Sequence, residues 1–176
     1  MDIDIFNPND LAKLEKFIKQ IEKDYKKAFK DSCTEVLNKT LEQVQENAVT
    51  LVLGDGVYND EFVDAVNGNE KKVIRNNGID FEGEVYNETE DSAYAEFGTG
   101  LVGISDPHFM SSPSGWKYAM NPDRDYSKGW YYSRNGLSHH TYGLPSSQYM
   151  YLASLDIEKN FKEIFDKKLK ERLSKY

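Results

Sequence analysis

Four residues in the second half of the chain have side chains that could do chemistry. Asp106 and His108 are two residues apart, and His139 and His140 are adjacent. Carboxylates and imidazoles bind zinc and act as general acids and bases. However, the pattern Asp-x-His is a weak signal on its own, and adjacent histidines point in different directions. We therefore expect no metal site and no catalytic residue here, with the three histidines exposed or at an interface.

Other signatures of catalysis or cofactor binding are missing from the sequence. There is no Gly-x-Ser-x-Gly elbow of a hydrolase, and Gly54-Asp55-Gly56 lacks the Lys-Ser/Thr of a phosphate-binding loop. The single cysteine, Cys33, excludes an internal disulfide, and its place in an amphipathic segment favours a packed thiol. We expect no cofactor, and an enzyme that uses the histidine loop is the least favoured function.

Composition and charge predict a soluble protein of a reducing, intracellular compartment. The 176 residues carry a net charge of −8, and no stretch approaches the roughly 20 apolar residues of a membrane span. The first residues lack the basic flank and apolar core of a signal peptide. No basic stripe typical of a nucleic-acid clamp is visible. We expect one domain over 1–176, no membrane partner and no sequence-specific nucleic-acid binding.

Amphipathic helices are expected at both ends of the chain. Apolar residues recur three or four positions apart over 7–52, and Asn7 and Pro8 suit the N-cap and the first helical position. A helix of this length spans roughly 65–70 Å at 1.5 Å per residue, so it either bends or projects toward another subunit. A similar stripe predicts a closing helix over 147–174.

A small antiparallel sheet is expected between these helices. Residues 73–75 and the pair Asn77-Gly78 indicate a strand and the tight turn of a hairpin. Apolar and acidic residues alternate over 79–85, which predicts a second strand with an acidic solvent face. Residues 93–97 are predicted as a third strand, antiparallel to the second. The fold class is therefore α+β, with a long N-terminal helix and a C-terminal helix packed on the sheet.

The segment 101–147 is expected to be an insertion that contacts another protein. It holds both tryptophans, all three histidines and four of the five prolines, but few charges, and it is too long for a plain connector. A hairpin is predicted around 134–136. The alternative, in which the aromatic residues fold back onto the core of the domain, stays open. The predicted contact residues are Trp116, Tyr118, Trp130, Tyr131, Tyr132 and Tyr142.

A short string at the end of the predicted third strand carries a family resemblance. It consists of Glu96, Phe97, Gly98, Thr99 and Gly100. A long helix precedes it, and the aromatic insertion, a Gly-x-Pro segment and a closing helix follow it. In this order of features the chain resembles the siphophage head–tail joining family, which includes tail components, type 1 neck proteins and tail-completion proteins.

The resemblance implies a structural protein without cofactors or catalytic residues. Such a protein forms a homo-oligomeric ring at the head–tail junction or the tail end, and its partners are the phage connector or tail-tube proteins. It is assembled in the host cytoplasm and then belongs to the virion, with DNA passing nearby. The acidic residues Glu82, Glu84 and Glu88 are predicted to face the channel. The alternative function is an acidic protein-binding or inhibitor module without a viral role.

Overall fold

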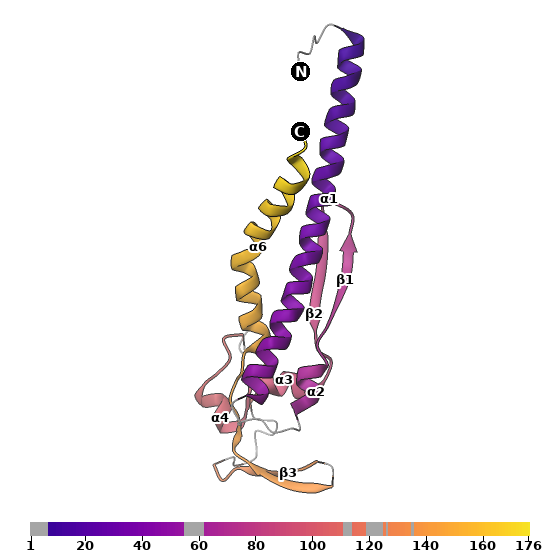
Figure 1. Ribbon diagram of the computed structural model, residues 1–176. Helices are drawn as coiled ribbons and strands as arrows, with labels where there is room; N and C mark the ends of the chain where they lie inside the picture. Colours follow the sequence, from indigo (N-terminus) through magenta and orange to yellow (C-terminus); the bar gives the residue numbers. More distant parts are fainter. Residues whose placement is uncertain (1–6, 55–61, 111–113, 119–124, 126, 135) are drawn as a thin grey trace. The chain divides into compact units, whose positions relative to one another are not determined.

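The computed structural model describes residues 7–54, 62–110, 114–118, 125, 127–134 and 136–176 (Figure 1). The fold class is α+β, as predicted, with two long helices and two small antiparallel sheets. The chain divides into two compact units. Unit 1 comprises 1–39, 71–84 and 157–176, and unit 2 comprises 40–70 and 85–156. Within the described part, no helix has an apolar run long enough to span a bilayer.

The predicted long helices are α1 (Pro8–Asn47) and α6 (Tyr149–Leu173), and both contribute residues to each unit. Asn7 begins α1 as predicted, because its Oδ1 accepts the Asn9 N–H at 3.0 Å. The end of α1 continues into a π-helical segment, η1 (Ala48–Leu53), which Gly54 closes.

The first predicted hairpin is confirmed as β1 (Glu70–Asn76) and β2 (Phe81–Tyr86). Asn77 shapes the turn, since its Oδ1 accepts the Asp80 N–H at 2.8 Å, and Gly78 has a φ of 90°. In Figure 1 the hairpin lies alongside α1. Gly83 on β2 permits a close approach to this helix, because a Cβ there would lie 3.0 Å from Leu37 Cδ2.

Ion pairs and aromatic contacts join α1 and α6 in unit 1. Lys168 Nζ lies 2.8 Å from Glu35 Oε2, and Arg172 pairs with Asp31. The ring of Phe165 packs edge-on against Tyr25 and Phe29 of α1. Together with the Lys175–Asp24 pair, these ion pairs move toward the start of α1 as the chain advances along α6, so the two helices are antiparallel here.

Cys33 is one of the buried residues of unit 1. It is a free thiol with 7% of its surface exposed. Burial disfavours the thiolate, so the pKa of Cys33 is raised. The prediction of a packed thiol is therefore confirmed.

The largest apolar core belongs to unit 2. It lies between η1, the short helix α2 (Val63–Asn67), the helix α3 (Glu90–Phe97) and the start of α6. Tyr149 is completely buried in it, and its hydroxyl lies 2.8 Å from Ser92 Oγ. Burial raises the pKa of Tyr149 to about 12. The buried core residues are Val44, Ala48, Val52, Phe62, Ala65, Val66, Ala95, Tyr149 and Ala153.

The prediction of a strand over 93–97 is wrong, because these residues belong to helix α3. Thr89 caps this helix, since its hydroxyl accepts the Ser92 N–H at 3.2 Å. Acidic residues occupy the first turn, where their negative charge interacts favourably with the positive end of the helix dipole. Gly98 ends the helix with a φ of 75°, and its N–H donates to Tyr94 O at 2.9 Å.

The segment 101–147 begins with the short helix α4 (Gly100–Ser105) and contains the second predicted hairpin. That hairpin is confirmed as β3 (Trp130–Arg134) and β4 (Leu137–Thr141), with Trp130 opposite Thr141 and Tyr132 opposite His139. The short strand β5 (Gly143–Leu144) then returns the chain to the beginning of α4.

Asp24 gives unit 1 a contact that depends on pH. Lys175, Tyr176 and Gln20 hydrogen-bond to its carboxylate, and together they hold its pKa well below the usual range. A depressed carboxyl pKa stabilises the folded state at a pH above the unfolded pKa of about 4, and this stability is lost as the pH falls through the folded pKa. We predict that the amide protection factors of residues 170–176 decrease when the pH is lowered beneath about 4.

The Asp24→Asn variant is the control for this prediction. Its protection factors at 170–176 should already be low at neutral pH and should change little on acidification. Hydrogen exchange followed by mass spectrometry measures both proteins. An equal acid-induced loss in both would show that another group is responsible.

Candidate functional site

The string Glu96-Phe97-Gly98-Thr99-Gly100, which carries the family resemblance, lies in unit 2. The carboxylate of Glu96 caps a helix there. Glu96 is only 5% exposed. Its Oε2 accepts the Met150 N–H at 2.8 Å, and its Oε1 accepts the Tyr151 N–H at 3.0 Å. These N–H groups belong to the first turn of α6, where a helix has no internal acceptors for them. The carboxylate satisfies both donors and complements the positive end of the helix dipole.

His108 is the third partner of this carboxylate. Its Nε2 lies 2.9 Å from Glu96 Oε1, and only 3% of the residue is exposed. Its Nδ1 accepts the Met110 N–H at 2.9 Å, so the ring is neutral and its proton is on Nε2, which donates to the carboxylate. The expectation of an exposed or interfacial histidine is wrong for His108, because a buried partner lies twelve residues earlier.

Aromatic rings surround this carboxylate–imidazole pair. Phe97 lies 4.6 Å from the His108 ring and stacks on Trp116 at 5.1 Å, measured between ring centroids. Tyr151 packs edge-on against His108 at 5.4 Å. The indole N–H of Trp116 donates to Gly98 O at 3.0 Å. Such surroundings strengthen the buried hydrogen bonds and raise the cost of breaking them.

The last residues of the string connect α3 to the far end of the aromatic insertion. Thr99 and Gly100 form β-bridges with Leu144 and Gly143, and Thr99 Oγ1 accepts the Leu144 N–H at 3.1 Å. A Cβ on Gly98 would lie 2.7 Å from Leu144 O. Glycine is therefore needed at Gly98 both for its positive φ and for this close approach.

No protein-family model, curated protein or solved structure matches this chain.

The arrangement around Glu96 is architectural. Both ring nitrogens of His108 and both carboxylate oxygens of Glu96 have hydrogen-bond partners inside unit 2. Among the residues that the structure describes, the ring nitrogens of His108 are hydrogen-bonded to Glu96 and to the Met110 N–H, and no serine hydroxyl is recorded as their partner. The pair therefore fixes the start of α6 against α3 and the insertion.

The other two histidines lie on the β3–β4 hairpin. His139 stacks on Tyr132 at 5.2 Å and His140 packs on Tyr131 at 4.7 Å, so the adjacent rings have different neighbours, as predicted. Asp106 is exposed at the end of α4. Among the residues that the structure describes, no group of three His, Cys, Asp or Glu side chains is arranged to hold a metal ion.

The predicted contact residues of the insertion fall into two sets. Trp116 and Tyr118 pack around the string, so the fold-back alternative describes these two. Tyr131 and Tyr142 are 68% and 52% exposed, and their role in an interface stays a prediction. Trp130 and Tyr132 are half-buried.

Two of the three carboxylates predicted to line a channel form ion pairs with basic residues. Glu82 Oε2 lies 3.1 Å from Arg75 Nη2, and Glu84 Oε1 lies 2.5 Å from Lys72 Nζ. Glu88 is exposed in the segment between β2 and α3. The outer face of β1–β2 therefore carries paired charges of both signs, and the channel role of its carboxylates stays a prediction.

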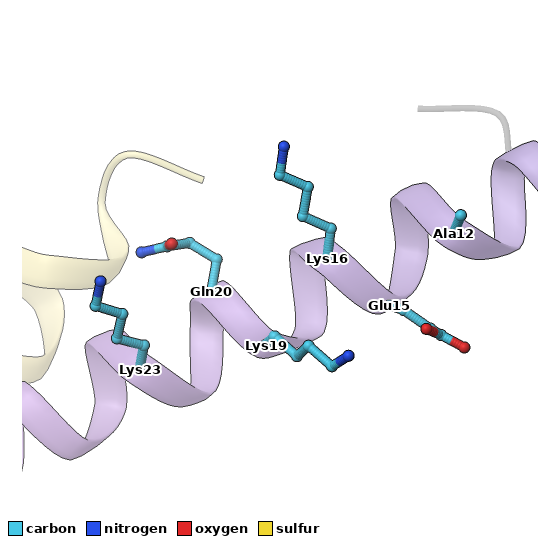
Figure 2. Close-up of a pocket in the computed structure, with 6 residues that line it drawn as sticks. All are labelled: Ala12, Glu15, Lys16, Lys19, Gln20 and Lys23. Atoms are coloured by element: carbon cyan, nitrogen blue, oxygen red, sulfur yellow. The ribbon is translucent and has the colours of Figure 1, made fainter.

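The first half of α1 carries a basic surface that we did not expect. Five exposed lysines recur at helical spacing and lie within an arc of about 80°. Three of them, Lys16, Lys19 and Lys23, line an open hollow of about 360 Å³. Figure 2 shows these lysines on α1 with Glu15 and Gln20. No carboxylate in the described chain pairs with any of the five. We call this surface the lysine stripe: Lys16, Lys19, Lys23, Lys27 and Lys30.

Removing the carboxylate of Glu96 should destabilise unit 2. Glu96→Ala leaves the N–H groups of Met150 and Tyr151 and the Nε2–H of His108 without acceptors, so we expect a loss of about 3 kcal/mol. Glu96→Gln keeps one carbonyl acceptor and should lose about half as much. Urea unfolding followed by tryptophan fluorescence measures this, because both tryptophans lie in unit 2.

The control for this experiment is Glu88→Ala, which removes an exposed carboxylate of the same unit. Its effect should stay within about 0.5 kcal/mol. If Glu96→Ala is equally mild, the cap does not hold the start of α6.

Gly98 and Gly115 offer a test of the close approach beside the string. Both have φ near +75°, but nothing lies within 4 Å of a Cβ on Gly115. Gly115→Ala should therefore cost about 1 kcal/mol of backbone strain alone. Gly98→Ala should cost at least about 2 kcal/mol, because the new methyl group also meets Leu144 O. Equal costs in urea unfolding would contradict a steric role for Gly98.

Proposed function

We propose that this chain is a structural protein of a siphophage or prophage particle, located at the head–tail junction or the tail end. There it completes or connects the tail as a ring of identical subunits. The observation that supports this proposal best is the use of the resemblance-bearing string. Its side chains are engaged in holding α3, α6 and the insertion together, and they leave no polar group for substrate chemistry.

The exposed end of the aromatic insertion supports a role in assembly. The β3–β4 hairpin and the residue after it present Tyr131, Leu137 and Tyr142 with 52–68% of their surfaces exposed. Aromatic and apolar side chains of this kind are enriched in the centres of protein interfaces. A hairpin held at its base by the string is suited to contact a neighbouring subunit or a tail protein.

Analysis of purified tailed particles tests this function. Mass spectrometry of particles from cells that produce the chain should detect it in several copies per particle. Electron cryomicroscopy should then place it in a ring at the neck or the tail end. If the chain is absent from the particles and is recovered instead with a basic protein, the inhibitor alternative replaces the phage proposal.

A matched pair of surface variants tests the contribution of the hairpin to assembly. Tyr131 and Ile79 are 68% and 67% exposed, and Ile79 lies in the turn between β1 and β2. We expect Tyr131→Ser to reduce the fraction of assembled protein about tenfold, while Ile79→Ser leaves it unchanged. Native mass spectrometry measures assembly, and circular dichroism confirms the fold of each variant. Equal behaviour of the two variants would remove the hairpin from the subunit contact.

A further inference from the structure

Charge is divided unevenly between the two units. Unit 2 holds only four of the 22 lysines and arginines but 15 of the 30 acidic residues, and unit 1 holds the remaining 18 and 15. The net charges are therefore −11 for unit 2 and +3 for unit 1. Two copies of the chain consequently present surfaces of opposite sign to each other, in addition to the net charge of −8 that each copy carries.

The positive charge of unit 1 includes the unpaired lysine stripe. The five lysines extend over about 21 Å of α1, at 1.5 Å per residue. Other lysines of unit 1 are neutralised within the chain, such as Lys26 by Glu22 and Lys175 by Asp24. The stripe therefore retains its full charge toward an external partner.

Unit 2 offers a groove that suits lysine side chains. It has a volume of about 500 Å³ and lies beside α3. The rings of Tyr94 and Trp116, 6.0 Å apart, form part of its wall together with Tyr118. Aromatic faces attract ammonium groups, and the alkyl part of lysine packs on them.

The carboxylate of Glu90 lines this groove. Glu90 accepts a hydrogen bond from the Tyr94 hydroxyl, and no lysine or arginine of the described part pairs with it. Lys117 also lines the groove and carries a positive charge. An incoming ammonium group would thus be attracted by Glu90 and repelled by Lys117.

We propose that the groove lined by Glu90, Tyr94 and Trp116 in one copy binds the lysine stripe on α1 of a second copy. The acidic character of unit 2 favours a second copy over nucleic acid as the occupant, because the net charge of the chain repels phosphate. The two surfaces differ, so the contact is heterologous, and repetition of such a contact closes a ring or extends a filament. This inference names the contact in the proposed ring but does not depend on a location in a virion.

Sedimentation velocity of the purified full chain tests this contact. The wild type should self-associate at about 0.05 M salt and dissociate at about 0.5 M, because screening weakens contacts between exposed charges. The triple variant Lys16→Glu/Lys23→Glu/Lys27→Glu and the single variant Glu90→Lys should each associate at least about tenfold more weakly. Lys117→Glu should instead strengthen association, which a purely structural role of the groove does not explain.

The matched control places the same charge changes on the other long helix. The residues Lys162, Lys167 and Lys170 are exposed on α6. Replacing all three by Glu changes the net charge as much as the stripe variant does, and it should leave association as in the wild type. A mixture of the stripe triple variant with Glu90→Lys should restore association, because one variant now carries an acidic stripe and the other a basic groove. The two variants should then alternate in the assembly, because the wild-type stripe of Glu90→Lys also fits the wild-type groove of the stripe variant.

Each outcome decides a separate question. A ring that survives the stripe reversal overturns this contact but leaves the proposed function intact. Salt-sensitive association that depends on the stripe, in a chain absent from tailed particles, supports the contact and overturns the proposed function. A wild-type chain that stays monomeric at low salt overturns the contact and the ring together. If stripe reversal abolishes DNA retention on a gel but not self-association, the stripe serves nucleic acid and the inference is wrong.

Discussion

Unit 2 depends on one interaction, the buried carboxylate of Glu96 at the start of α6. The same side chain receives two backbone N–H groups from that helix and the imidazole N–H of His108. It therefore links α3, the aromatic insertion and the closing helix, which are distant from one another along the chain. A buried charge is costly unless its partners are all in place, so these three segments must reach their positions together.

This constraint changes the meaning of the residues that first suggested chemistry. An acid and a histidine in hydrogen-bond contact are common in catalytic sites, but here each donor and acceptor is used inside the fold. Phe97 and Trp116 cover the pair instead of leaving it open to a ligand. Function is therefore better sought on the outer surfaces, where the lysine stripe and the rings of Tyr131 and Tyr142 are exposed.

Local signals in the sequence sufficed for most of the fold. Helical periodicity and the Asn-Gly turn predicted α1, α6 and both hairpins, because these elements depend on neighbouring residues. The prediction of a strand over 93–97 was wrong because five residues fit the period of a strand and that of a helix equally well. The Thr89 cap and Gly98 delimit a helix here. The burial of His108 depends on a contact twelve residues away, which no local pattern reveals. The lysine stripe occupies one helical face of 16–30, and acidic residues interrupt it along the chain, so no run of basic residues marks it in the sequence.

The buried thiol of Cys33 makes the two units distinguishable in solution. Because it is the only cysteine and lies in unit 1, covalent labelling of this sulfur proceeds only when that unit opens. The tryptophans report on unit 2 in the same sample. The rates of thiol modification and of fluorescence change therefore measure whether the chain unfolds as one cooperative body or in two steps.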